Sequence, residues 1–226
     1  MSCGSNCCGT ADFFGDRIAR RHLRKYRRGG PFGTTKRLLA ALRETPGPKD
    51  SLLDVGGGVG MIAHEMLAAG ASSAAIVDAS PAFLDAARAE SERRHTSDRL
   101  RLQLGDAVEL RDDVPQADVV TLDKVVCCNA DLPLLLGDVV LRARRMIGLI
   151  YPRDRWWNAI AAKALAAFGW LTRDSTRWYL HSDEEVDGFL RRAGFERHEV
   201  SRTIIWQVAL YVRPAGQVSV STPSSP

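Results

Sequence analysis

The clearest chemistry in the chain lies in a glycine-rich turn with an acidic neighbour. Residues 56–60 read Gly-Gly-Gly-Val-Gly and follow a short apolar run, 52–55, that contains Asp54. Glycines allow a ligand to approach the backbone, and the helix that follows such a turn offers unpaired N–H groups. A P-loop needs Lys and then Ser or Thr after its last glycine, where this chain has Met61 and Ile62. The turn therefore predicts a ligand site, but not a nucleoside triphosphate bound through that motif.

Asp54 discriminates between the remaining ligand classes. The motif Gly58-x-Gly60-x-x-Ala63 fits a dinucleotide fingerprint, so the glycines alone leave NAD open. A carboxylate beside the turn repels a pyrophosphate and attracts a cation. S-adenosylmethionine (SAM) carries a sulfonium and an ammonium group and no phosphate. Asp78 ends the next apolar run, where a carboxylate can bind both ribose hydroxyls. We therefore expect SAM in this site.

The elements that position these residues alternate between short apolar runs and helical segments. This pattern predicts an α/β fold, a Rossmann-like doubly wound sheet that is mostly parallel. The expected strands cover 52–55, 74–78, 100–104, 117–122, 146–151, 195–201 and 204–212. The expected helices cover 12–28, 34–43, 59–69, 81–94, 132–145, 155–168 and 183–193, the last with a capping box from Ser182. The short link between the last two strands predicts an antiparallel end to the sheet.

The ordered set of residues 53–60, Asp78 and Gly105-Asp106 resembles the class I SAM-dependent methyltransferases over residues 36–212. The resemblance implies that family's seven-stranded sheet with an antiparallel last strand, and SAM as the cofactor. It places the expected cofactor contacts at Asp54, Gly56, Gly58, Gly60, Asp78, Asp106 and Asp123. Asp54 and Gly56 would lie near the methionine part, Asp78 at the ribose and Asp106 near the adenine. Asp123 would face both cofactor and acceptor.

Two further stretches, 125–131 and 151–157, resemble a branch of small methyltransferases related to magnesium-protoporphyrin O-methyltransferase. A porphyrin carboxylate is then one acceptor among several. Methyl transfer from a sulfonium is an in-line displacement that alignment can accelerate. A general base is needed only for an acceptor that is protonated when it attacks. The candidates near strand ends are Tyr151, Lys124, Asp154 and His181, and none carries a motif that singles it out as the base.

The expected acceptor contacts follow the fourth and fifth strands or begin the last one. Arg153 and Arg155 could hold an acidic substrate, with an internal Arg–Asp ion pair as the alternative. Trp156 and Trp206 could wall an aromatic pocket, as could Trp157, Trp170 and Trp178, with core packing as the alternative. Cys128 would lie close to the transferred methyl group.

Five cysteines, Cys3, Cys7, Cys8, Cys127 and Cys128, form a poor disulfide framework and indicate a reducing, cytoplasmic setting. They are also the weak candidates for a soft-metal or metalloid site, with inert buried thiols as the alternative. We see no secretory signal and no run long enough to span a membrane.

Basic charge is concentrated near the N-terminus. The chain has 226 residues and a net charge of +4, and residues 17–37 hold nine Lys or Arg and no acid. We expect three parts: a Cys-containing basic arm or lid over 1–35, a SAM-binding domain over 36–213, and a disordered tail over 214–226. The arm would lid the cofactor site, steer an anionic substrate or bind nucleic acid.

The sequence thus predicts a SAM-dependent methyltransferase that acts on a small anionic or aromatic acceptor, with O-methylation favoured. An RNA methyltransferase that uses the arm, and a thiol-based metal or metalloid binder that retains a SAM pocket, are the alternatives. The sequence gives no indication of the oligomeric state.

Overall fold

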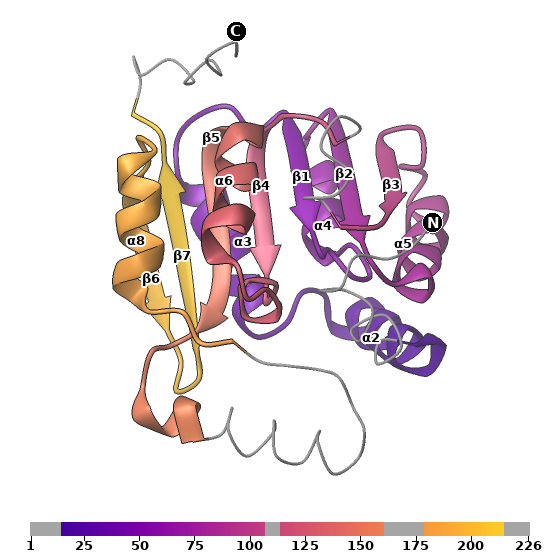
Figure 1. Ribbon diagram of the computed structural model, residues 1–226. Coiled ribbons are helices and arrows are strands. Elements are labelled where there is room, and N and C mark those ends of the chain that lie inside the picture. Colours follow the sequence, from indigo (N-terminus) through magenta and orange to yellow (C-terminus); the bar gives the residue numbers. More distant parts are fainter. Residues whose placement is uncertain (1–14, 107–113, 161–178, 215–226) are drawn as a thin grey trace, which may run out of the picture.

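The computed structural model describes residues 15–106, 114–160 and 179–214, which form one sheet with helices on both faces (Figure 1). The sheet has seven strands in the order β3-β2-β1-β4-β5-β7-β6. The strands are β1 (Ser51–Val55), β2 (Ser73–Asp78), β3 (Leu100–Leu104), β4 (Ala117–Asp123), β5 (Ala143–Pro152), β6 (Glu196–Arg202) and β7 (Trp206–Val212). The helices are α2 (Asp16–Gly29), α3 (Thr34–Glu44), α4 (Met61–Ala68), α5 (Pro81–Arg93), η1 (Val126–Cys128), α6 (Leu132–Arg142) and α8 (Asp183–Arg192).

The strand directions confirm the expected α/β class. Neighbouring strands from β3 to β5 run parallel, whereas β7 runs antiparallel to both β5 and β6. All the parallel strands therefore end at the same edge of the sheet, the lower edge in Figure 1. Ligands of open α/β sheets bind outside this edge.

Two local predictions differ from the structure. The helix expected over 132–145 ends at Arg142, because Ala143 is already extended and pairs with Ala117 of β4. Hydrogen bonding to β4 thus replaces the last expected helical turn. The link between the closing strands has three residues, not two. The Thr203 N–H donates to the Trp206 carbonyl at 2.8 Å and closes that turn.

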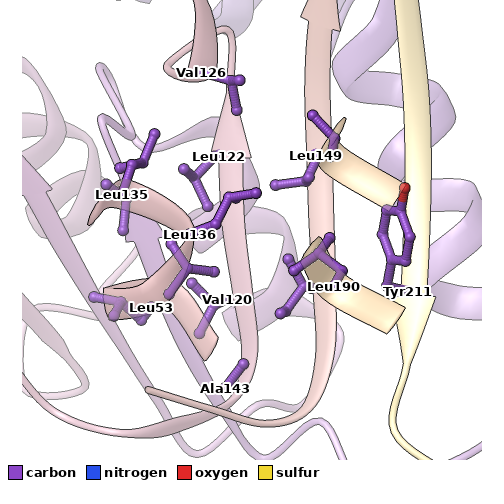
Figure 2. Packing of buried hydrophobic residues seen from close by; sticks show 14 of the residues in the cluster. Leu53, Val120, Leu122, Val126, Leu135, Leu136, Ala143, Leu149, Leu190 and Tyr211 are labelled. Atoms are coloured by element: carbon purple, nitrogen blue, oxygen red, sulfur yellow. The ribbon is translucent and has the colours of Figure 1, made fainter. Parts of the chain in front are cut away.

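Alternation along β1 explains how the two faces of the sheet are covered. Leu53 and Val55 point into one apolar cluster, which α6 and α8 close (Figure 2). Leu52 points into the opposite cluster, which α3, α4 and α5 close. Side chains of a strand alternate between faces, so Asp54 must point to the same side as Leu52. This placement puts a carboxyl group beneath the start of α4.

Helix α2, formed by most of the basic arm, is anchored on α5 and α4. Its apolar side, which includes Leu23 and Tyr26, packs against Val59 and residues of α5. The Tyr26 hydroxyl donates to Glu65 Oε1 at 2.9 Å, and Arg27 Nε donates to Glu90 Oε2 at 2.7 Å. The helix is therefore docked on the domain beside the ligand edge.

Several expectations fall outside the described residues or remain untested. Cys3, Cys7, Cys8, Trp170, Trp178 and nearly all of the tail lie outside the described residues, as does the start of the helix expected at 12. The division of the chain at 35 and 213 stays a prediction. In the described parts of the chain, no helix is both long and apolar enough to cross a membrane.

Candidate cofactor and acceptor site

A cavity of about 260 Å³ opens at the carboxyl ends of β1, β2 and β4. Its walls come from the glycine turn, the ends of β2 and β4, η1 and helix α2. The lining residues are His22, Phe32, Val55, Gly56, Gly57, Gly58, Val59, Met61, Val77, Asp78, Ala79, Phe83, Gly105, Asp106, Asp123, Lys124, Val125, Cys128, Asn129 and Leu135. Most of the expected cofactor contacts thus meet in one place.

The glycine turn has a backbone shape that other residues rarely adopt. Gly56, Gly58 and Gly60 have φ values of 62°, 57° and 77°. A β-carbon at Gly56 would overlap Val125 Cγ2. The backbone N–H of Gly56 donates to the Val77 carbonyl at 2.7 Å. Gly56 and Gly58 line the cavity, whereas Gly60 lies just outside it as the residue before α4. Apart from Val59, the turn therefore exposes backbone to the cavity.

Asp78 holds the turn and faces the cavity at once. Its Oδ2 accepts from the Gly58 N–H and its Oδ1 from the Ser80 N–H, both at 2.8 Å. Burial raises the pKa of this carboxyl, although the two backbone hydrogen bonds oppose the shift. A carboxylate has about four acceptor positions, so both oxygens can also accept from ribose hydroxyls. Asp106 and Phe83 line the cavity near it.

Asp54 is close to the site but is not on its wall. Only 1% of the residue is exposed, and Oδ1 accepts from Thr121 Oγ1 at 2.6 Å. Its Oδ2 has no hydrogen-bond partner among the described residues and lies directly beneath Gly57. Burial raises the pKa of Asp54 to about 7. The sequence places this charge in contact with the ligand, whereas the structure places it one layer below the turn.

Asp123 and Lys124 form the polar wall that follows β4. Asp123 Oδ1 lies 2.6 Å from Lys124 Nζ, and the Thr35 hydroxyl donates to Asp123 Oδ2. Lys124 has a φ of 65°, a left-handed conformation that is costly for a residue with a side chain and tends to occur at functional sites. Its N–H donates to the Ile150 carbonyl at 2.8 Å, which fixes the turn. An ammonium group is thereby held at the cavity wall.

Tyr151 is built into a network on the α8 face of the sheet and lies outside the cavity walls. Its hydroxyl donates to Asp183 Oδ1 and accepts from Gln207 Nε2, both at 2.7 Å. Burial raises the pKa of Tyr151 strongly. These contacts give the hydroxyl a structural role, so we do not carry Tyr151 forward as a base.

The segment after β5 also stays outside the cavity walls. Arg153 bonds to the β6–β7 turn through its own N–H and its guanidinium, and Asp154, Arg155 and Trp156 are exposed. Trp206 is adjacent to the site, because Lys124 Nζ lies 5.5 Å from its ring centroid. Among the substrate candidates in the described ranges, Cys128 alone lines the cavity.

His181 lies behind the cavity wall. One of its ring nitrogens, Nε2, is 2.8 Å from the carbonyl oxygen of Asn129, which lines the cavity. It therefore positions a wall residue.

His22 and Phe32 are wall residues that the sequence did not single out. They come from α2 and the loop after it, far from the motifs in sequence. The His22 ring packs edge-on against Phe83, with ring centroids 5.7 Å apart. Burial lowers the pKa of His22, and Lys25 and Lys124 lower it further. The one signal for this wall was the expectation that the basic arm forms a lid.

The two described cysteines lie on η1. Both thiols donate to the Lys124 carbonyl, Cys127 at 3.3 Å and Cys128 at 3.6 Å. Their mutual hydrogen bond and burial raise the pKa of Cys127. Within the described ranges, no group of three or more His, Cys, Asp or Glu side chains is placed to hold a metal ion.

Comparison with known proteins agrees with this geometry. Residues 52–143 match a family model described as a methyltransferase domain. The ubiquinone/menaquinone biosynthesis C-methyltransferase UbiE of Acidiphilium cryptum (strain JF-5) is 27% identical over 180 residues, which cover 72% of each chain.

Solved structures share the fold at low sequence identity. Magnesium protoporphyrin IX methyltransferase from Synechocystis PCC 6803, with bound SAH, is 19% identical with a TM-score of 0.68, covering 93% of this chain and all of that one. An O-methyltransferase family 2 protein from Planctomyces limnophilus DSM 3776, in complex with apigenin, is 19% identical with a TM-score of 0.63, covering 88% of this chain and 62% of that one. Together with the strand order and the cavity, these similarities support a SAM-dependent methyltransferase with the class I fold.

Proposed function

We propose that the enzyme transfers the methyl group of SAM to a small anionic or aromatic acceptor, with oxygen as the favoured acceptor atom. The observation that carries this proposal is Lys124, an ammonium group held by a left-handed turn at the wall of the cavity. The glycine turn and Asp78 account for the cofactor half of the cavity. Lys124, Val125, Cys128, Asn129 and Leu135 would then form an acceptor half with several apolar side chains and one ammonium group, which Asp123 pairs at 2.6 Å.

These residues can act on an acceptor without metal chemistry. Lys124 would orient an anionic group, and Val125, Leu135 and Phe32 would exclude water around the methyl group. A carboxylate acceptor attacks as it stands, because it is already deprotonated at neutral pH. A phenol would have to lose a proton. His22 is the group at the wall that can take it, since its lowered pKa keeps the imidazole neutral.

The similar proteins support this acceptor class without fixing it. The Planctomyces structure contains apigenin, a flat phenol, and the Synechocystis enzyme acts on a porphyrin. The similar curated enzyme is a C-methyltransferase, so carbon remains the competing acceptor atom.

The test is a methyl-transfer assay with labelled SAM after calorimetry has established that SAM binds. The acceptors are matched pairs: an aromatic carboxylate and its amide, a phenol and its methyl ether, magnesium protoporphyrin, and a short RNA. We expect methylation of the free carboxylate or phenol and no reaction of the capped partner. Methylation of the capped partners alone would move the acceptor atom to carbon, and methylation of RNA alone would replace the small-molecule proposal.

A carboxylate and a phenol can be distinguished by His22→Asn. For a phenol we expect kcat to fall and its pH dependence to change, because the proton acceptor is lost. For a carboxylate kcat should stay within about threefold, because an acceptor that is already ionised needs no base. An equal loss with both acceptors would mean that His22 acts through packing against Phe83.

A further inference from the structure

We infer that the sheet edge at which the cavity opens is a docking face for an anionic lipid bilayer. Eight large apolar side chains are exposed in the described ranges, and five of them gather at this edge. They are Trp156, Trp157, Ile160, Ile204 and Ile205, with exposed fractions of 71%, 36%, 58%, 77% and 45%. Monomeric proteins rarely expose such a cluster unless it contacts a partner.

The apolar cluster is a fixed surface. Trp157 Nε1 donates to the Ile204 carbonyl at 3.3 Å, and Asn158 Nδ2 donates to the Ile205 carbonyl at 3.0 Å. Trp156 and Trp157 stand edge to face with ring centroids 5.7 Å apart. The segment after β5 and the β6–β7 turn are thereby joined into one face.

This face borders the cavity. Trp206 follows Ile205 directly, and its ring lies 5.5 Å from the ammonium group of Lys124, a cavity residue. The β6–β7 turn and α2 both lie at the lower end of the molecule in Figure 1. An amphiphile that rests in a bilayer against the cluster could reach the cavity along Trp206.

Charge selects a bilayer over other apolar partners. The side of α2 that faces away from the domain carries Arg17, Arg20, Arg21, Arg24, Lys25 and Arg28, all exposed. Asp16 is the one acidic residue of α2 and pairs with Arg20 at 3.6 Å. The basic face of α2 and the exposed indoles and isoleucines lie toward opposite sides of the same lower end of the molecule (Figure 1), and basic and apolar groups on one face are the combination that binds anionic interfaces. RNA would use the arginines but would not need three exposed isoleucines.

The idea that the acceptor reaches the cavity from the bilayer rests on the proposed methyl transfer. The docking of the protein on the bilayer does not depend on that proposal. Docking is therefore measured without SAM, by co-sedimentation with vesicles of phosphatidylcholine, with and without phosphatidylglycerol. We expect sedimentation with the anionic vesicles that weakens as salt is raised. SAM affinity of each variant, measured separately, reports whether the enzyme itself is intact.

The matched variants separate the two parts of the face. Ile204→Ser with Ile205→Ser should reduce vesicle binding about tenfold, since binding scales with buried apolar area. Leu141→Ser changes a leucine of similar exposure, 51%, at the opposite edge and should have no effect. Arg24→Glu should weaken binding at least fivefold, since each basic residue near the surface contributes about that factor. Arg144→Glu, at the start of β5, should leave vesicle binding unchanged.

Two results would overturn the inference. The first is no sedimentation with anionic vesicles at low salt. The second is sedimentation that Arg24→Glu abolishes while the isoleucine variant is unaffected and RNA competes, because the face would then be a general polyanion surface. Neither result would bear on the methyltransferase activity.

Discussion

The proposed cofactor half and the proposed acceptor half of the cavity are built in different ways. The proposed cofactor half comes from one continuous stretch, β1 to α4, and from the ends of β2 and β3, and it presents glycine backbone and the carboxyl groups of Asp78 and Asp106. The acceptor half assembles side chains from α2, the turn after β4 and η1. Backbone fixed by glycine dihedral angles suits a ligand that never changes. Side chains on separate elements suit a substrate that differs between relatives.

Gly56→Ala tests the backbone-built half most severely. We expect SAM affinity to fall more than about 100-fold, because the left-handed conformation alone costs about 1–2 kcal/mol and the new methyl group would overlap Val125. Calorimetry measures the affinity. The control is Gly29→Ala, where a β-carbon meets open space.

A second substitution makes this test specific. Val125→Ala in the Gly56→Ala background should restore part of the affinity, because it removes the overlap and leaves the backbone strain. If Gly56→Ala alone binds SAM within threefold of the native chain, the turn does not cradle the cofactor.

Asp78→Asn tests the carboxyl group that holds the glycine turn in the proposed cofactor half. Hydrogen bonds to a charged acceptor contribute about 1.5–3 kcal/mol, so we expect SAM to bind roughly 10- to 100-fold more weakly. Asp118→Asn is a matched control. Asp118 also accepts two backbone N–H groups, from Asp50 and Ser51, but at the far end of the sheet. Equal losses in both variants would mean that Asp78 acts only through the stability of the fold, which thermal unfolding would report.

The same contrast explains what could be predicted from the sequence. The glycine turn, Asp78 and Asp106 are local motifs whose chemistry follows from residue type and order. His22 reaches the cavity only because α2 packs across α5, a contact that no local pattern encodes. Tyr151 illustrates the opposite error: it lies near the correct end of β5, but strand alternation turns its side chain toward α8. For a residue near the end of a strand, its register in the sheet, and not its residue type, decides whether the side chain faces the cavity.

Lys124→Met tests the acceptor half. We expect KM for an anionic acceptor to rise about tenfold, because a partly exposed charge-assisted contact contributes about 1.5 kcal/mol. SAM affinity and KM for a neutral acceptor should stay within twofold. Lys36→Met, which removes an exposed charge of α3, is the control for net charge. A tenfold loss of SAM affinity instead would mean that the two halves share Lys124.

Asp54 lies outside the walls of both halves of the cavity. The pH dependence of stability and of SAM affinity can show whether it acts on the cofactor. Burial raises its folded-state pKa to about 7, above the ordinary 3.8. Below about pH 7 the protonated form is therefore favoured in the folded protein, and the free energy of unfolding should fall as pH rises from about 4 to about 7. Asp54→Asn should flatten that part of the stability curve, measured by denaturant unfolding at each pH.

A cation bound near the unpartnered Oδ2 of Asp54, beneath Gly57, would favour the deprotonated form of this carboxyl group. If the ammonium group of SAM acts on Asp54, binding expels a proton, and SAM affinity should rise by up to about eightfold between pH 6 and 7.5, the limit for one group that titrates near 7. 5′-Methylthioadenosine, which lacks the ammonium and the sulfonium, should show no such rise. Asp54→Asn should abolish the slope for SAM. A slope that survives in this variant would assign the titration to Asp78, whose pKa burial also raises, and would leave Asp54 as a support for the turn alone.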